Sequence, residues 1–160
     1  MSPSTEKQST PTTPPADRWV KLARAELQRA GHRSSAPRAA VVELLGRQSC
    51  VVSAREISDR LHAEGNPVGI ATVYRTLELL ARMRLVQRLD MGTDPARYEP
   101  ALPDGDHHHH HLVCEQCSQV TAFDDPALER AIDRLSRELD YRVGDHDVVL
   151  RGLCPACHSN

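Results

Sequence analysis

Four cysteines are spaced in a way that suits a tetrahedral metal ion. Cys114 and Cys117 form one Cys-x-x-Cys turn, and Cys154 and Cys157 form a second one, with 36 residues between the two pairs. Two such turns supply the four sulfur ligands of a structural zinc site. The alternatives are a pair of disulfides or four unpaired thiols. Because the N-terminus lacks the apolar stretch of a secretory signal, we expect a reducing, cytoplasmic setting, in which zinc is favoured.

A run of five histidines at 107–111 precedes the first cysteine pair. In an extended segment side chains alternate, so His108 and His110 would point one way and His109 and His111 the other. One strand would then serve two metal sites, each with a pair of imidazoles. The alternative is a loop that scavenges divalent ions without a defined site.

Other ligand types are available to complete these two pairs. Glu129, on an expected helix, and His146, on an expected final strand, are candidates to join one pair. Glu99, at the end of an expected hairpin, is the candidate for the other. Taken singly, Glu129 and His146 also suit ordinary surface positions, so their role depends on being brought together.

The elements that would carry Glu99 are predicted over residues 17–100. Capping residues predict helices that begin near Asp17, at Ser35-Ala-Pro37 and at the capping box Ser53-Ala-Arg-Glu56. A further helix is predicted over 69–83, and alternation at 85–90 and 96–99 predicts a hairpin. In that further helix, the apolar residues at helical spacing are expected to face the core. They are Ile70, Val73, Leu77 and Leu80.

Short helices followed by a two-stranded hairpin are the pattern of a winged helix-turn-helix, whose last helix enters the major groove of DNA. Charge agrees with this, because residues 1–100 hold 15 Lys and Arg against 11 Asp and Glu. Residues 101–160 hold 5 basic against 11 acidic residues. The alternative for the N-terminal half is a generic helical domain with a solvated basic surface.

The C-terminal half is expected to be small and to need support. Asp125-Pro126 predicts a helix to about residue 139, and a strand is predicted near 141–150. Only 3% of all residues are aromatic, so zinc and a partner subunit would supply stability that a small core lacks. The Ser-, Thr- and Pro-rich residues 1–16 are expected to be a disordered tail. No stretch is apolar enough to predict a membrane span.

Several of these segments together resemble the ferric uptake regulator family of metal-dependent bacterial repressors. The matching segments are Pro37-Arg38, GIATVYRTLELL (69–80), RYE (97–99), HHHHLVCEQC (108–117) and RGLCPAC (151–157). The order and spacing of these segments agree with the family over about residues 17–158.

The resemblance implies an α+β fold: a winged-helix DNA-binding domain at 17–100, followed by a small α/β dimerisation domain at 101–160 with a four-cysteine zinc site. It also implies a homodimer that binds a double-stranded DNA operator. Four sets of residues are carried over from it. The structural zinc set is Cys114, Cys117, Cys154 and Cys157; a second metal set is His108, His110, Glu129 and His146; the sensing set is Glu99, His109 and His111; the DNA-binding set is Arg33, Tyr74 and Arg75, to which we add Thr72.

The sensing set departs from the common subtypes of the family. Val51 and Ala122 stand where many iron and peroxide sensors have a His and an acid, which weakens the peroxide-sensor interpretation. Ala101 and Gln87 stand where zinc sensors often have a Cys and an Asp. Cys50 is a candidate fourth ligand that would favour zinc; its alternative is a buried, inert thiol.

The sequence therefore predicts a metal-responsive repressor of metal-homeostasis genes rather than an enzyme. The expected regulatory ion is Zn²⁺, with Fe²⁺ as the alternative, and no membrane or small-molecule substrate is expected. Two other functions were weighed. A zinc hydrolase is disfavoured because the cysteine quartet is saturated and no HExxH motif is present. A metal store or chaperone would leave the TVYR helix and the hairpin unexplained.

Overall fold

The structure is a computed structural model that describes residues 16–48, 50–90, 92, 95–101, 109–144 and 146–159. The predicted disordered tail lies outside the described residues except for Ala16. The described residues divide into two compact units, 16–101 and 109–159. Each unit is described by itself. Among the described residues, no helix is both long and apolar enough to span a membrane.

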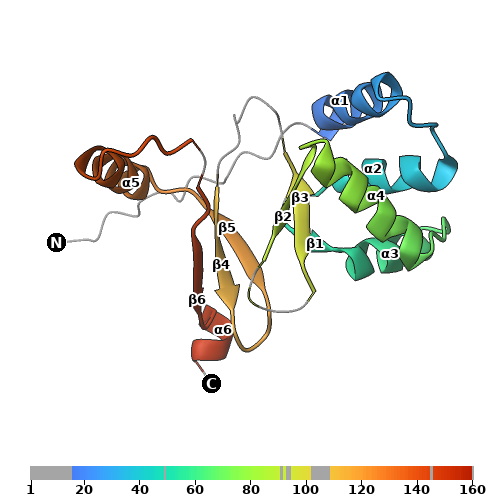
Figure 1. Cartoon of the computed structure of the whole chain (residues 1–160). Coiled ribbons are helices and arrows are strands. Elements are labelled where there is room, and N and C mark those ends of the chain that lie inside the picture. The colour runs from blue at the N-terminus through green and yellow to red at the C-terminus, as the bar shows by residue number, and fades with distance from the viewer. Residues whose placement is uncertain are drawn as a thin grey trace. The chain divides into compact units, whose positions relative to one another are not determined.

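The first unit consists of helices and a small antiparallel sheet in the order β1-β3-β2 (Figure 1). Its fold is the winged helix that the sequence predicts. Its elements, in chain order, are α1 (Ala16–Arg29), α2 (Ala36–Gly46), β1 (Val52–Ser53), α3 (Ala54–Ala63), α4 (Ile70–Arg82), β2 (Val86–Leu89) and β3 (Arg97–Pro100).

Local capping chemistry sets the starts of two of these helices. The Ser35 side chain accepts a hydrogen bond from the Arg38 N–H at the start of α2. At α3, the Ser53 side chain accepts from the Glu56 N–H, and the Glu56 carboxylate accepts from the Ser53 N–H. Both caps are as predicted. Asp17 is not the cap of α1, because that helix begins one residue earlier at Ala16.

A buried apolar cluster holds the first unit together, and all its members lie between Trp19 and Tyr98. Trp19 is fully buried, and its Nε1 donates hydrogen bonds to the carbonyls of Leu85 (2.8 Å) and Ala101 (3.2 Å). These bonds tie α1 to the segments that precede β2 and follow β3.

The predicted stripe of α4 is confirmed except at its first position. Val73, Leu77 and Leu80 are fully buried, whereas Ile70 is 43% exposed. Ile70 is the first residue of the helix, so it lies beyond the turns whose side chains pack in the core.

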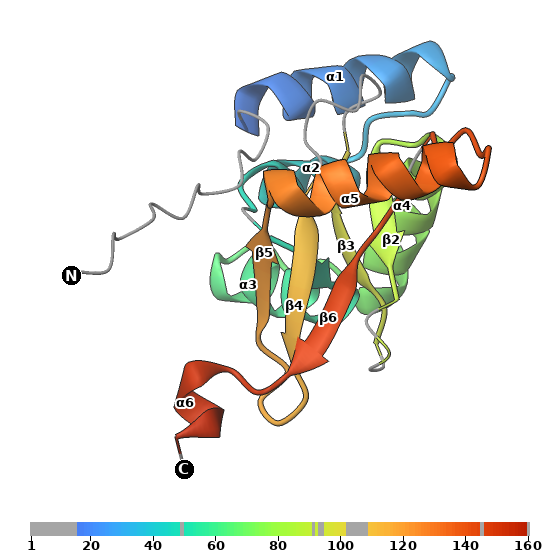
Figure 2. The same ribbon diagram turned by 90° about the vertical axis from the view of Figure 1, so that its left-hand side faces the viewer.

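The second unit is a three-stranded sheet in the order β5-β4-β6 with two helices. Strand β4 lies between its neighbours, antiparallel to β5 and parallel to β6 (Figure 2). Helix α5 lies at one end of this sheet and α6 at the other. The elements are β4 (His110–Cys114), β5 (Val120–Phe123), α5 (Pro126–Glu138), β6 (Val149–Gly152) and α6 (Pro155–His158).

Helix α5 begins as predicted, because the Asp125 side chain accepts from the N–H groups of Ala127 and Leu128. The final strand is shifted from its prediction at 141–150 to Val149–Gly152. Its position follows from parallel pairing with β4, which joins His111 to Val149 at one end and Cys114 to Gly152 at the other.

Candidate metal centre

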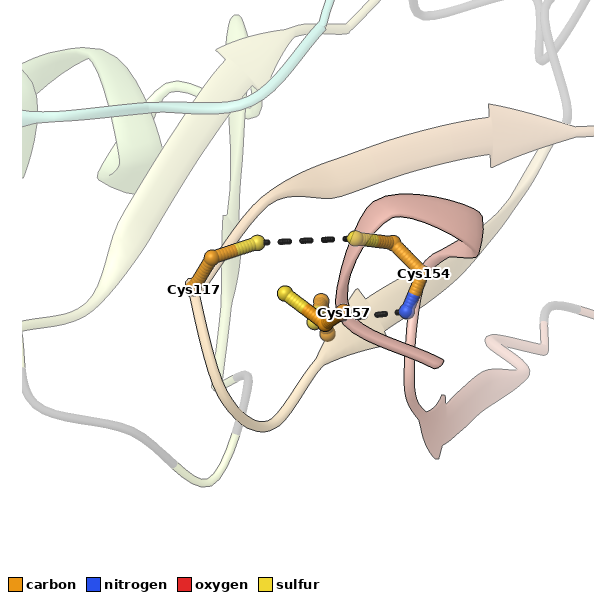
Figure 3. A group of neighbouring side chains, drawn as sticks. Cys117, Cys154 and Cys157 are labelled. Atoms are coloured by element: carbon orange, nitrogen blue, oxygen red, sulfur yellow. Dashed lines mark hydrogen bonds between the residues drawn. The ribbon is translucent and has the colours of Figure 1, made fainter. Parts of the chain in front are cut away.

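The four cysteines come together where β4 ends and α6 begins. Cys114 is the last residue of β4, Cys117 follows in the turn to β5, and Cys154 caps α6, which contains Cys157. Their four sulfur atoms lie within 4.8 Å of one another. The Cys117 and Cys154 sulfurs are 3.7 Å apart (Figure 3). This arrangement is what a tetrahedral site with four sulfur ligands requires.

The electrostatics of the quartet favour a bound cation. Backbone N–H groups of Cys117 and Cys154 stabilise the Cys114 thiolate and lower its pKa to about 6. The hydrogen bond with the Cys154 sulfur raises the pKa of Cys157 to about 12. Four thiols this close do not all ionise on their own, because each new thiolate is repelled by the last. A zinc ion removes this obstacle and displaces the remaining protons.

A second cluster joins β4 to α5. Glu129 Oε1 lies 2.7 Å from His110 Nε2, and Glu129 Oε2 lies 3.2 Å from His146 Nε2. The ligand atoms of these three residues lie within 4.8 Å of one another. His110 is fully buried and packs on Phe123, with ring centroids 5.4 Å apart. Two imidazoles and a carboxylate in one place form a donor set for a divalent transition-metal ion.

His108, the fourth residue of this predicted set, lies outside the described residues. The strand geometry separates this cluster from the cysteines, because His110 begins β4 and Cys114 ends it. At about 3.3 Å per residue, four residues span roughly 13 Å. The unit therefore offers two separate ligand groups at opposite ends of one strand.

The predicted sensing set draws on both units, and each part is described in its own unit. His109 and His111 lie together in the second unit, with ring centroids 4.9 Å apart, while His110 between them turns to Glu129. In the first unit, Glu99 is on β3 opposite Gln87, and Cys50 precedes β1.

The predicted DNA-binding residues all lie in the first unit. Thr72, Tyr74 and Arg75 are in the first half of α4, where Tyr74 is 39% exposed and Arg75 is also exposed. Arg33 is exposed in the loop before α2. Arg38 had no predicted role beyond its place in the matching segment Pro37-Arg38, although its Nε is buried.

Comparison with known proteins identifies the family. The sequence model described as "Ferric uptake regulator family" matches residues 29–151. This chain belongs to the ferric uptake regulator family. The ferric uptake regulation protein of Neisseria gonorrhoeae is 34% identical over 136 residues, which cover 84% of this chain and 92% of that protein.

Two solved structures of the family are similar to this chain. The Vibrio cholerae ferric uptake regulator is 30% identical with a TM-score of 0.74, covering 82% of this chain and 98% of that one. A zinc-bound manganese uptake regulator is 25% identical with a TM-score of 0.65, covering 88% and 99%. Members of the family are metal-responsive transcription regulators rather than enzymes. The predicted fold, a winged helix followed by an α/β dimerisation domain with four clustered cysteines, is therefore confirmed.

Proposed function

We propose that this chain is a repressor of metal-homeostasis genes, acting in the cytoplasm as a metal-bound homodimer on a palindromic operator. The observation that carries the proposal is the combination of an exposed face on α4 with His- and Glu-containing ligand groups in the second unit. A metal store would need the ligands alone, and a constitutive DNA-binding protein would need α4 alone. A metal-responsive repressor needs both.

The cysteine quartet is proposed to hold the structural zinc. The sulfur separations and the low pKa of Cys114 support this assignment. His110, Glu129 and His146, with His108, are proposed as a second divalent-metal site, supported by the 2.7 and 3.2 Å contacts of Glu129.

The regulatory site is proposed to be Glu99, His109 and His111, with Cys50 as candidate fourth ligand. An ion held by both β3 and the start of β4 would fix the angle between the domains and so the separation of two recognition helices in a dimer. A metal ion shifts the equilibrium between the DNA-competent form and the other forms of the protein only if it binds the DNA-competent form more tightly. We propose Zn²⁺ as the effector because the soft sulfur of Cys50 suits zinc. The alternative is Fe²⁺, because the curated relatives are named ferric uptake regulation proteins.

A homodimer is supported by apolar surface in the second unit. Leu112 and Leu150 are paired across β4 and β6, and they are 44% and 46% exposed. Helix α5 has no buried residue, and Leu135 on it is 52% exposed. Apolar surface of this kind marks protein–protein contact sites.

On the DNA, Tyr74, Arg75 and Thr72 are proposed to contact bases in the major groove, and Arg33 the minor groove. Phosphate contacts position the protein, whereas a few base contacts specify the sequence.

The test is fluorescence anisotropy with a duplex from the gene's own promoter region, in a chelator that strips the regulatory ion and spares the cysteine zinc. Adding back Zn²⁺, Fe²⁺ or Mn²⁺ should raise affinity about 5–150-fold for the true effector. Arg75→Ala should weaken operator binding by roughly 1–3 kcal/mol. The control is Arg47→Ala, which removes an equal charge from the surface pair with Glu64. Metal-independent affinity would refute the proposal.

A further inference from the structure

A loop joins the end of α1 to the beginning of α2 (Figure 1). A groove of about 600 Å³ lies beside this loop in the first unit. Leu27, Ala39 and Val42 give it an apolar floor. Its volume falls in the range of small-molecule sites, about 300–1,000 Å³. The groove therefore has the size and the apolar surface to hold a ligand larger than a single ion.

The charged groups around this floor are all basic. Arg24, Arg33, Arg38 and His32 line the groove, and none of the described residues that line it is acidic. Arg24 forms an ion pair with Glu43. Within the described part of the chain, neither Arg33 nor Arg38 forms an ion pair with a carboxylate, so their charges are available to an anion.

Arg38, which lines the groove, is anchored by one hydrogen bond. Its Nη1 donates a hydrogen bond of 2.5 Å to the carbonyl oxygen of Arg33. Its Nε is buried and has no hydrogen-bond partner among the described residues. Buried donors are nearly always paired in folded proteins, so an unpaired one marks a place where a ligand or water oxygen is expected.

We propose that this groove binds a small organic anion, a phosphate or carboxylate attached to an apolar body. The anionic oxygens would accept from the Arg38 guanidinium, which is suited to such groups, and the apolar body would lie on Leu27, Ala39 and Val42. A DNA backbone phosphate offers the same charge, but it brings no apolar body to fill the floor. Because Arg33 is also among the proposed DNA contacts, the bound anion would lower operator affinity; this last step alone rests on the proposed function.

The test uses phenyl phosphate, which has both the anionic group and the apolar body. Inorganic phosphate, which has only the anionic group, and phenol, which has only the ring, are the control probes. Binding to the full-length dimer is followed, without DNA, by calorimetry and by the arginine Nε–H signals in ¹⁵N NMR spectra. We expect phenyl phosphate to bind more tightly than either control and to shift the Arg38 Nε–H.

Two substitutions test the groove, one at its arginine and one at its apolar floor. Arg38→Gln removes the guanidinium, and Ala39→Glu places a carboxylate at the floor; each should weaken phenyl phosphate binding about tenfold or more. Arg29→Gln is the matched control, because Arg29 lies in the last turn of α1, pairs with Glu26 and does not line the groove. Thermal unfolding of each variant checks that it is folded.

Failure of phenyl phosphate to bind would overturn the proposal. Equal binding of phenyl phosphate and inorganic phosphate would also overturn it, because the groove would then be a bare phosphate contact of the kind that DNA supplies. As these measurements contain no DNA, they are independent of the proposed repressor function. A fall in operator affinity with phenyl phosphate, at matched ionic strength, would test the coupling separately.

Discussion

The first unit has one packed cluster of buried apolar side chains, with members from Trp19 on α1 to Tyr98 on β3. In the described part of the second unit, the only buried apolar residues are Val113 and Cys114. In the second unit, helix α5 buries no residue, while His110 is fully buried on β4. The first unit thus has the core of an ordinary small domain. The second places metal-type ligands at its centre and leaves apolar side chains exposed.

This difference teaches how stability and sensing are divided along the chain. A small unit without an apolar core depends on a staple or a partner. The zinc proposed at the cysteine quartet would supply that stability, whereas the proposed regulatory ion would use a different group of ligands.

Removing one sulfur of the quartet should unfold the second unit and spare the first. Structural zinc contributes apparent binding energies of about 10–16 kcal/mol in small zinc domains, far more than this unit's core supplies. Cys154→Ser should lose the zinc proposed at the quartet, and NMR signals of residues 109–159 should collapse while those of 16–101 persist. Gln116→Ala is the control, because Gln116 is exposed in the same turn and supplies no sulfur. If Cys154→Ser retains zinc and dispersed NMR signals, the second unit does not depend on the cysteine site for its stability.

Truncating a core side chain of the first unit should destabilise that unit and leave the metal site of the second unit intact. Trp19→Ala removes a fully buried ring and two hydrogen bonds, so the free energy of unfolding of the first unit should fall by about 3–5 kcal/mol. Urea unfolding followed by circular dichroism measures this loss, with Arg29→Ala as surface control. Zinc content should stay at the wild-type level, and its loss would indicate that the units are not separately stabilised.

A charge in place of the exposed Leu135 on α5 should weaken the proposed dimer. Leu135→Arg is expected to cost roughly 1–3 kcal/mol of association free energy, which sedimentation equilibrium detects as an increased dimer Kd. Arg134→Gln is the control, because its ion pair with Glu138 is exposed and contributes little. An unchanged Kd for Leu135→Arg would place the interface elsewhere.

The smallest effect concerns the cap of α3 and its pH dependence. Burial would raise the pKa of Glu56, but the Ser53 hydrogen bonds and the charge of Arg97 lower it below 4.5. A lowered folded pKa stabilises the protein above the unfolded value, and this stabilisation is lost as pH falls through the folded pKa.

The side chain of Glu56 is 42% exposed, so the contribution should stay below about 1 kcal/mol. Glu56→Gln should therefore destabilise the first unit slightly at pH 7, and the difference from wild type should shrink as pH falls below 4.5. A difference that grows toward low pH would have the wrong sign.

Short-range chemistry determines the features that were predicted best from the sequence. The caps at Ser35, Ser53 and Asp125 are formed with residues two or three positions away. Strand β1 was not predicted, because its two residues are defined by pairing with β3, which joins Val52 to Tyr98. The position of β6 was shifted for the same reason.

In the candidate site too, features set by residues close in sequence were predicted, whereas those set by distant contacts were not. Spacing alone predicted the cysteine quartet, since each pair lies in one turn. Glu129 and His146 were candidates from residue type, and only the placement of α5 and the following loop brings them to His110. Residue type did not indicate the groove at Arg38, because its features depend on how α1 and α2 pack.

The most direct test of the account is the reciprocity of metal and DNA binding. If the regulatory ion proposed at Glu99, His109 and His111 controls DNA binding, then DNA must raise metal affinity by the same factor as metal raises DNA affinity. Competitive chelator titration of the zinc-loaded dimer, with and without the promoter duplex, measures this. The account predicts about 5–150-fold tighter binding of the regulatory ion in the presence of DNA. Equal metal affinity in both titrations, with the duplex bound, would contradict it.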